Sequence, residues 1–175
     1  MSQLEASMII VSDIHLNRPE DSRGQGLLNL LKDVEEGEVD HLVLLGDIFD
    51  FCLGSHSFFQ RKFKPIGDAL SRVAAKGTRV SFLEGNHEFR LSALPWEGVH
   101  IIASGTEHFI LADGKTVQAA HGDMIYSHRR YKAFRWLVKS WLVTFIASFL
   151  PGPWMDKLAT TGSEVSRSAD QYRTI

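Results

Sequence analysis

The sequence predicts an α/β fold in which a largely buried sheet is flanked by helices. Three short apolar runs at 8–11, 42–45 and 79–83 suit parallel strands that are buried on both faces. Helical patterns separate these runs, and a polar motif follows each of them directly. In an open α/β sheet such motifs meet at the carboxyl ends of the strands, where ligands bind.

Two helices are expected between the strands. An apolar stripe at helical spacing runs from 27 to 34 and ends near Gly37. A second helical pattern covers 58–75, where Pro65 is expected to kink or break the helix and Gly77 to end it.

After Asn86 the pattern changes. Residues 99–103 and 108–111 resemble strands, Asp113-Gly114 is a hairpin turn signal, and 116–120 is the expected partner strand. We therefore expect this part of the sheet to be antiparallel or mixed.

The remainder is predicted to be helical, at 128–150 and again at about 154–169. Pro151-Gly152-Pro153 separates these helices but does not mark a domain boundary. We expect one domain over 1–175, with 124–170 as a helical insertion or lid.

Composition limits the functional classes. The chain has 175 residues, 44% hydrophobic and 23% charged, as an ordinary globular domain does, and its net charge of −2 gives no reason to expect nucleic-acid binding. Its single cysteine, Cys52, excludes an internal disulfide and fits a reducing compartment. No signal-peptide pattern is visible, so we expect a cytoplasmic protein.

Four motifs carry the chemistry: Ser12-Asp13-Ile14-His15, Gly46-Asp47-Ile48-Phe49-Asp50, Gly85-Asn86-His87-Glu88 and His121-Gly122-Asp123. The intervals from Asp13 to Asp47, from Asp47 to Asn86 and from Asn86 to His121 are 34, 39 and 35 residues. A strand–helix–strand unit takes about 30 residues or more, so we expect all four loops at one edge of one sheet.

These residue types predict a metal site. Asp13 and His15 are two residues apart, which at a strand end places both side chains on one face, within reach of one cation. Asp47 offers two oxygens that can bridge two cations, Asn86 an amide oxygen and His121 an imidazole. Such oxygen and nitrogen ligands suit Mn²⁺, Fe²⁺, Zn²⁺ or Mg²⁺. Two such ions about 3.5–4 Å apart bind a phosphoryl oxygen and activate a water.

Three further residues have supporting roles in this interpretation. His87 is placed to protonate a leaving oxygen or to stabilise charge in the transition state. Asp50 and Asp123 are placed to orient ligand imidazoles. Each motif alone is compatible with an ordinary solvated loop or turn. All four in this order, each after an apolar run, favour the metal site.

The motif series over residues 8–123 resembles the calcineurin-like metallophosphoesterases. That resemblance implies a four-layer sandwich of two mixed β-sheets flanked by helices, with a dinuclear metal centre. By motif, Asp13, His15 and Asp47 would bind one metal, and Asp47, Asn86 and His121 the other. His87 and Asp50 would belong to the catalytic machinery, with His87 as the catalytic histidine.

A narrower resemblance is to the UDP-2,3-diacylglucosamine diphosphatases of lipid A biosynthesis. It rests on the same motifs together with Tyr131-Lys132-Ala133-Phe134-Arg135. It implies hydrolysis of the pyrophosphate of a diacylated UDP-sugar to UMP and a lipid monophosphate, usually with two Mn²⁺ ions. The best-known members carry arginine where this chain has His87. A metallophosphoesterase with another substrate therefore remains an alternative.

The segment after the fourth motif favours a lipid substrate. Residues 140–155 are uncharged and rich in tryptophan, and basic residues precede them. This pattern suits an interfacial helix or an acyl-chain pocket at the inner-membrane surface, although a helix that packs on the core would also explain it. Candidate contacts to the phosphorylated glycolipid are Arg129, Arg130, Tyr131 and Arg135.

The superfamily's last motif, Gly-His-x-His, is absent from these 175 residues. We therefore expect a chain that lacks its C-terminal strands, or an incomplete site, with weak or no activity. A non-catalytic domain that kept the fold is the remaining alternative.

Overall fold

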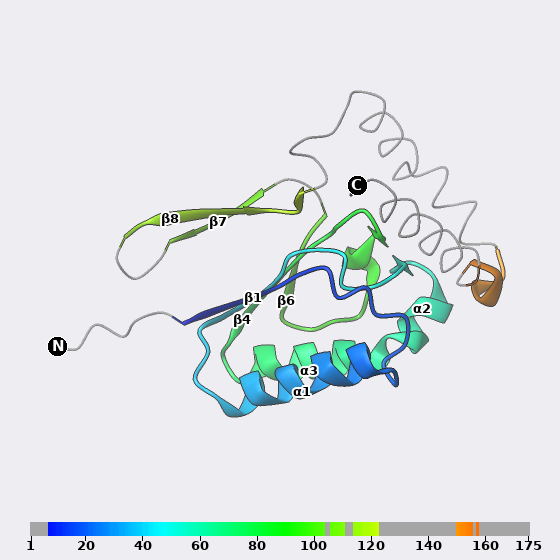
Figure 1. Cartoon of the computed structure of the whole chain (residues 1–175), viewed down its shortest axis with the longest axis horizontal. Coiled ribbons are helices and arrows are strands. Elements are labelled where there is room, and N and C mark those ends of the chain that lie inside the picture. The colour runs from blue at the N-terminus through cyan, green and yellow to red at the C-terminus, as the bar shows by residue number, and fades with distance from the viewer. Residues whose placement is uncertain (1–6, 104–105, 111–113, 123–149, 156, 158–175) are drawn as a thin grey trace, which may run out of the picture.

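The computed structural model describes residues 7–103, 106–110, 114–122, 150–155 and 157. At its centre lies a parallel sheet of four strands in the order β1-β2-β4-β6 (Figure 1). The strands are β1 (Met8–Val11), β2 (His41–Leu44), β4 (Arg79–Leu83) and β6 (Val99–Ile102). Three of them match the predicted apolar runs to within one residue at each end, and the α/β class is confirmed.

Two helices, α1 (Ser22–Glu36) and α3 (Lys64–Ala75), cover one face of this sheet (Figure 1). The Asp21 side chain caps α1 by accepting from the Gly24 N–H, which satisfies a donor that has no partner within the helix. The second predicted helix is divided as expected: α2 (Ser57–Lys62) ends before Phe63, and Pro65 stands in the first turn of α3.

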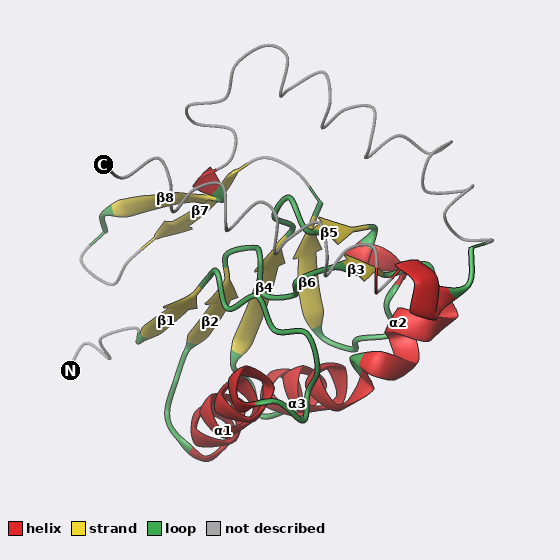
Figure 2. Cartoon of the chain, turned by 45° about the vertical axis from the view of Figure 1, so that its right-hand side comes forward, coloured by secondary structure: helices red, strands yellow, loops and turns green. Residues whose placement is uncertain are grey.

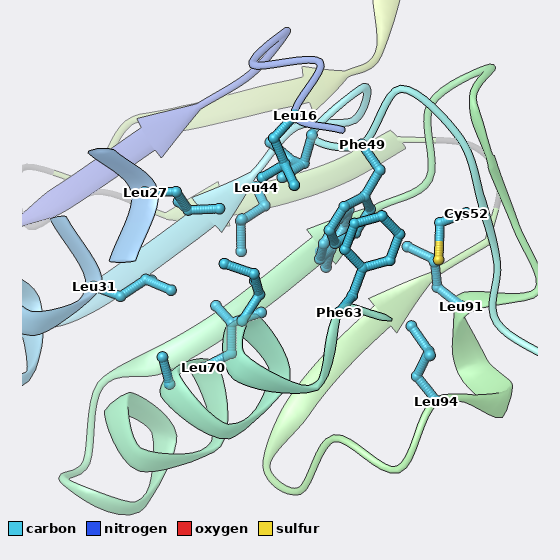
Figure 3. Packing of buried hydrophobic residues seen from close by; sticks show 14 of the residues in the cluster. Leu16, Leu27, Leu31, Leu44, Phe49, Cys52, Phe63, Leu70, Leu91 and Leu94 are labelled. Carbon is cyan, nitrogen blue, oxygen red and sulfur yellow. The ribbon is translucent and has the colours of Figure 1, made fainter. Parts of the chain in front are cut away.

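The main core lies between the sheet and these helices. Leu27 and Leu31 of α1 and Leu70 of α3 pack around Leu44 of β2 (Figure 3). All four side chains are buried. Neighbouring positions on the strands face the other way: Val43 of β2 joins a second apolar cluster on the opposite face. Burial on both faces is what continuous apolar strands require.

The opposite face is covered by an antiparallel hairpin of β7 (Thr106–Ile110) and β8 (Thr116–Ala120) (Figure 1). Phe109 and Ala119 of the hairpin belong to the same cluster as Val43 and Leu83 of the sheet. The predicted hairpin is confirmed. It forms its own two-stranded sheet, so the expectation that all four motifs end strands of one sheet is wrong for His121.

The expectation that the sheet after Asn86 is antiparallel or mixed holds for the β7–β8 hairpin but not for β6. β6 pairs with β4 in parallel, from Val80 beside Val99 to Leu83 beside Ile102. The intervening chain, which includes the short helix η1 (Leu91–Ala93), returns to the amino edge of the sheet before β6 begins. A crossover of that kind makes the strands parallel.

A further pair of short strands, β3 (Cys52–Leu53) and β5 (Glu88–Phe89), was not predicted. They pair in parallel beyond the carboxyl ends of β2 and β4 (Figure 2). Just before β3, an isolated bridge joins Leu16 to Phe49. These contacts tie together the three loops that follow β1, β2 and β4.

Part of the predicted architecture falls outside the described residues. The structure shows one parallel sheet with helices on one face and a hairpin on the other, and the two full sheets of a four-layer sandwich are not both within it. Of the helical insertion expected at 124–170, only 150–155 and 157 are described, and 152–155 are helical. Within the described residues, no helix has the length and hydropathy needed to cross a membrane.

His41 provides a test of the packing between sheet and hairpin. The His41 ring is buried and lies edge-on to the Phe109 ring, with the two centroids 4.8 Å apart. Its Nε2 is 3.1 Å from Ser81 Oγ. Burial, with a smaller effect of the Arg79 charge, lowers the pKa of His41, while the Glu107 charge opposes the shift. The folded state therefore binds fewer protons than the unfolded state below about pH 6.5.

The free energy of unfolding is thus expected to fall as pH drops from the unfolded pKa of His41, about 6.5, toward its lower folded pKa. In His41→Gln this part of the acid dependence should flatten, as measured by urea denaturation at several pH values. His100, which is exposed on β6, supplies the control, His100→Gln. If the free energy of unfolding fell as steeply with decreasing pH in His41→Gln as in the wild type, His41 would not be the cause of this acid dependence.

Candidate metal centre

Four loops meet around an open pocket of about 350 Å³. Three follow the carboxyl ends of β1, β2 and β4, and the fourth follows β8. The pocket is lined by Ser12, Asp13, Leu45, Asp47, Asn86, His121 and Gly122. The candidate ligands Asp13, Asp47, Asn86 and His121 therefore face one space, although His121 comes from a different sheet.

Asp47 lies at the centre of these contacts and is buried. Its Oδ2 is 3.4 Å from His121 Nε2, and its Oδ1 accepts from the His87 N–H at 3.2 Å. His15, Asp47 and His87 form a group whose potential ligand atoms all lie within 4.8 Å of one another. His121 therefore lies beside Oδ2 of Asp47, and the His87 backbone lies beside Oδ1. The imidazoles of His15 and His87 are also close to this carboxylate.

The Asn86 amide links Asp47 to His87. Its NH₂ group donates to Asp47 Oδ2 at 2.8 Å, and its oxygen accepts from His87 Nε2 at 3.1 Å. Asn86 therefore lies in direct contact with the buried carboxylate and with the imidazole on its other side.

The backbone at three candidate ligands is unusual. Asp13, His15 and Asp47 have φ values of 54°, 49° and 53°, in the left-handed region that non-glycine residues seldom adopt. Such conformations concentrate at functional sites, where the surrounding structure holds them in place.

The prediction that Asp13 and His15 share one face assumed that both residues continue an extended strand, and that assumption is wrong. β1 ends at Val11, and neither residue is extended. His15 joins Asp47 and His87, whereas the exposed Asp13 lines the pocket with Asn86.

Asp50 contacts both neighbouring imidazoles. Its backbone carbonyl is 2.7 Å from His87 Nδ1, and its carboxylate Oδ1 is 3.7 Å from His15 Nδ1. The two rings meet edge to face with their centroids 5.0 Å apart. With a proton on Nδ1, the His87 ring donates to the Asp50 carbonyl. This hydrogen bond fixes the ring orientation so that the other nitrogen, Nε2, lies beside Asn86.

Electrostatics favour the charged forms of both Asp47 and His121. Burial raises the pKa of Asp47, but the hydrogen bond and charge of His121, with contributions from His87, more than offset it, so the net pKa is lowered. The hydrogen bond to Asp47 raises the pKa of His121, with burial opposing. A carboxylate that stays charged while buried is suited to binding a cation.

Glu88 is a buried residue beside the candidate ligands, and the sequence analysis gave it no role. Its side chain is fully buried. Oε2 accepts from the N–H groups of Asp47 (2.9 Å) and Gly85 (2.8 Å), and Oε1 accepts from that of Phe49 (3.1 Å). Burial, together with the nearby Asp47 charge, raises the pKa of Glu88 to about 7, although the three N–H donors oppose this. One carboxylate thus joins the loops that carry Asp47 and Asn86. The available signal was its position as the last residue of the third motif, directly before the apolar Phe89.

The candidate substrate contacts Arg129, Arg130, Tyr131 and Arg135, together with Asp123, lie outside the described residues. Their predicted roles remain predictions.

Gly46 lies so close to His121 and Gly85 that there is no room for a side chain. Its φ is +82°, and a Cβ built there would stand 2.6 Å from His121 Nδ1 and 2.8 Å from Gly85 Cα. We expect Gly46→Ala to lower the free energy of unfolding by about 3 kcal/mol, from left-handed strain and steric overlap together. Thermal or urea denaturation measures this.

Gly114 is the matched control, because it has the same φ of +82° and an added Cβ would have nothing within 4 Å of it. Gly114→Ala should cost about 1–2 kcal/mol, the left-handed strain alone. Equal losses in the two variants would show that the close approach at Gly46 does not matter.

Comparison with curated proteins finds relatives described as UDP-2,3-diacylglucosamine hydrolases. The chain is 24% identical to that of Neisseria meningitidis serogroup B, with 93% of this chain and 68% of the relative covered. It is 27% identical to that of Azotobacter vinelandii, with 91% and 66% covered, and 26% identical to that of Edwardsiella ictaluri, with 82% and 55% covered. The chain thus spans about half to two thirds of the length of these relatives.

Among solved structures, a protein of unknown function from Aquifex aeolicus matches with a TM-score of 0.40 and 18% identity, covering 76% of this chain and 72% of that one. The sequence model of the family described as calcineurin-like phosphoesterase matches residues 6–160. The chain therefore belongs to the calcineurin-like phosphoesterase family.

Proposed function

We propose that this chain is a metal-dependent phosphoesterase domain whose converging loops hold two divalent ions. The observation that carries this proposal is the approach of Asp47, Asn86 and His121 within one pocket, where Asp47 Oδ2 lies 3.4 Å from His121 Nε2 and 2.8 Å from the Asn86 amide. The buried, ionised Asp47 supplies the negative charge that a cation needs. Membership of the family implies divalent metals independently of this geometry.

The proposed ligand sets follow the two sides of Asp47. His15 and Asp13 would complete one site, and Asn86 and His121 the other. The oxygen and nitrogen donors suit Mn²⁺, Fe²⁺, Zn²⁺ and Mg²⁺. Among these we propose Mn²⁺, the ion that the resemblance to the diphosphatases implies. When bound, such ions polarise a phosphoryl oxygen and lower the pKa of a water.

His87 is proposed to manage the proton of the leaving oxygen. The Asp50 carbonyl holds its Nδ1 at 2.7 Å, so Nε2 remains at the site, beside Asn86. With its ring fixed from behind, Nε2 can deliver a proton without a search over ring orientations. The Asp50 carboxylate, 3.7 Å from His15 Nδ1, is proposed to orient that ring.

As the specific substrate we propose UDP-2,3-diacylglucosamine, cleaved at its pyrophosphate to UMP and a lipid monophosphate. The curated relatives bear that substrate in their descriptions, at 24–27% identity. Trp154 and Leu150, which are 72% and 45% exposed, offer apolar surface to an acyl chain or to the inner-membrane surface. Arg129, Arg130, Tyr131 and Arg135 are the proposed contacts to the charged part of the substrate.

The test is UMP release from UDP-2,3-diacylglucosamine with Mn²⁺, set beside hydrolysis of bis(4-nitrophenyl) phosphate. We expect both reactions to stop in EDTA and the lipid substrate to be preferred. Equal or faster hydrolysis of the generic diester would instead favour a general metallophosphoesterase, which a histidine at position 87 also fits. A substitution of His87 by alanine that left turnover unchanged would remove the role given to that residue.

A further inference from the structure

We propose that a second site, separate from the candidate metal centre, binds a phosphate monoester that carries a planar ring. It is an open groove of about 430 Å³ between the loop after β1 and helix α2. The groove, called here the basic groove, is lined by Arg18, Glu20, Phe58, Arg61, Lys62 and Pro65. None of these residues lines the pocket of the metal centre.

Charge is the first argument. Three cations, Arg18, Arg61 and Lys62, face the groove, and Glu20 is the one carboxylate in its lining. Within the described part of the chain, neither Arg18 nor Arg61 has a hydrogen bond or ion pair from its guanidinium group. Like charges gathered in a concave surface raise the local concentration of anions.

Chemistry selects phosphate among anions. A guanidinium presents its N–H donors as a planar fork that matches two phosphate oxygens, and two such groups with one ammonium match a phosphate with its several oxygens. The volume of about 430 Å³ lies within the usual range for small-molecule sites, roughly 300–1,000 Å³. A phosphate alone would fill only part of that space.

The remaining wall is apolar and held in place. Phe58 meets Phe59 edge to face at 5.2 Å. Gly152 also lies so close that an added Cβ would be 2.3 Å from Phe58 Cβ. With Pro65 beside it, Phe58 presents a fixed apolar surface against which a ring attached to the phosphate can pack.

A hydrogen bond connects the basic groove to the loop that carries His15. Lys62 Nζ donates to Asn17 Oδ1 at 2.9 Å, and Asn17 follows His15 by two residues. Figure 1 shows the loop after β1 running toward α2 before α1 begins. Three residues of extended chain span at most about 11 Å, so Arg18 is anchored close to His15. A ligand in the groove would therefore lie near the metal centre.

This inference goes beyond the proposed function, because it requires neither bound metal nor hydrolysis. Binding is measured in EDTA by isothermal titration and by amide NMR shifts, with UMP, inorganic phosphate and uridine as probes. We expect UMP to bind more tightly than inorganic phosphate and uridine not to bind measurably. The shifts should centre on residues 18, 61 and 62.

The double variant Arg18→Gln/Arg61→Gln should weaken UMP binding at least about tenfold at low salt. The matched control is Arg79→Gln, an exposed arginine at the amino end of β4, which should leave binding unchanged. Equal affinity for UMP and inorganic phosphate would overturn the role of Phe58. Unchanged affinity in the double variant, or NMR shifts that centre on Asp13, Asn86 and His121 instead, would place the anion outside the groove and overturn the proposal.

Discussion

Asp47→Asn is expected to lower metal-dependent turnover by roughly a thousandfold or more, because the proposed bridging carboxylate loses its charge. Asparagine is close in size and tolerates the left-handed backbone at this position, so the fold should be little affected. Removing the charge also relieves its repulsion of Glu88. We therefore expect lost Mn²⁺ binding by isothermal titration together with a nearly unchanged free energy of unfolding.

Asp33→Asn is the control for this change, since Asp33 is exposed on α1. It should leave both turnover and Mn²⁺ affinity as in the wild type. Full Mn²⁺ affinity in Asp47→Asn would show that the metal lies elsewhere.

Glu88→Gln should lower the free energy of unfolding by about 3 kcal/mol, as much as Gly46→Ala. The carboxylate accepts three backbone N–H groups, whereas an amide has one acceptor oxygen and an NH₂ group that would face donors. The loops that carry Asp47 and Asn86 lose their common anchor, so metal affinity should fall by about 10–100-fold as well.

Glu36→Gln provides the comparison, because Glu36 is exposed and pairs only loosely with Lys32 at 3.7 Å. Its effect should stay within about 0.5 kcal/mol. Urea denaturation of the metal-free proteins measures both. A loss in Glu88→Gln no larger than in Glu36→Gln would mean that the hydrogen bonds of Glu88 do not hold the loops.

The raised pKa of Glu88 also predicts how the free energy of unfolding depends on pH. Its pKa is raised from 4.5 to about 7 in the folded state, so between these values the folded state holds a proton that the unfolded state has lost. This contribution makes the metal-free protein less stable as pH rises through that window. The corresponding slope should be absent in Glu88→Gln.

Most of the fold was predictable from local patterns. The apolar runs at β1, β2 and β4 and the break at Pro65 are visible in the sequence because periodicity and proline act over a few residues. The direction of β6 was not, since a buried strand has the same apolar pattern in either direction. β3 and β5 are two residues long and too short to show a period.

The candidate site shows the same division. Motif chemistry indicated which side chains would meet, and the structure brings Asp47, Asn86 and His121 into one pocket. The hydrogen bonds of Glu88 depend on backbone groups up to 41 positions away along the chain, which no local pattern encodes. The assignment of Asp47, Asn86 and His121 as metal ligands remains a prediction.

The left-handed backbone at Asp13, His15 and Asp47 restricts which substitutions these positions can accept. Asparagine, aspartate, histidine and glycine adopt that conformation far more readily than β-branched residues do. The range of side chains open to mutation is therefore already narrowed by conformation, before any requirement for metal is applied. In a library randomised at these three codons and selected only for folding, valine, isoleucine and threonine should be depleted even though no catalysis is demanded. Such a depletion would separate the constraint set by chain geometry from the constraint set by chemistry.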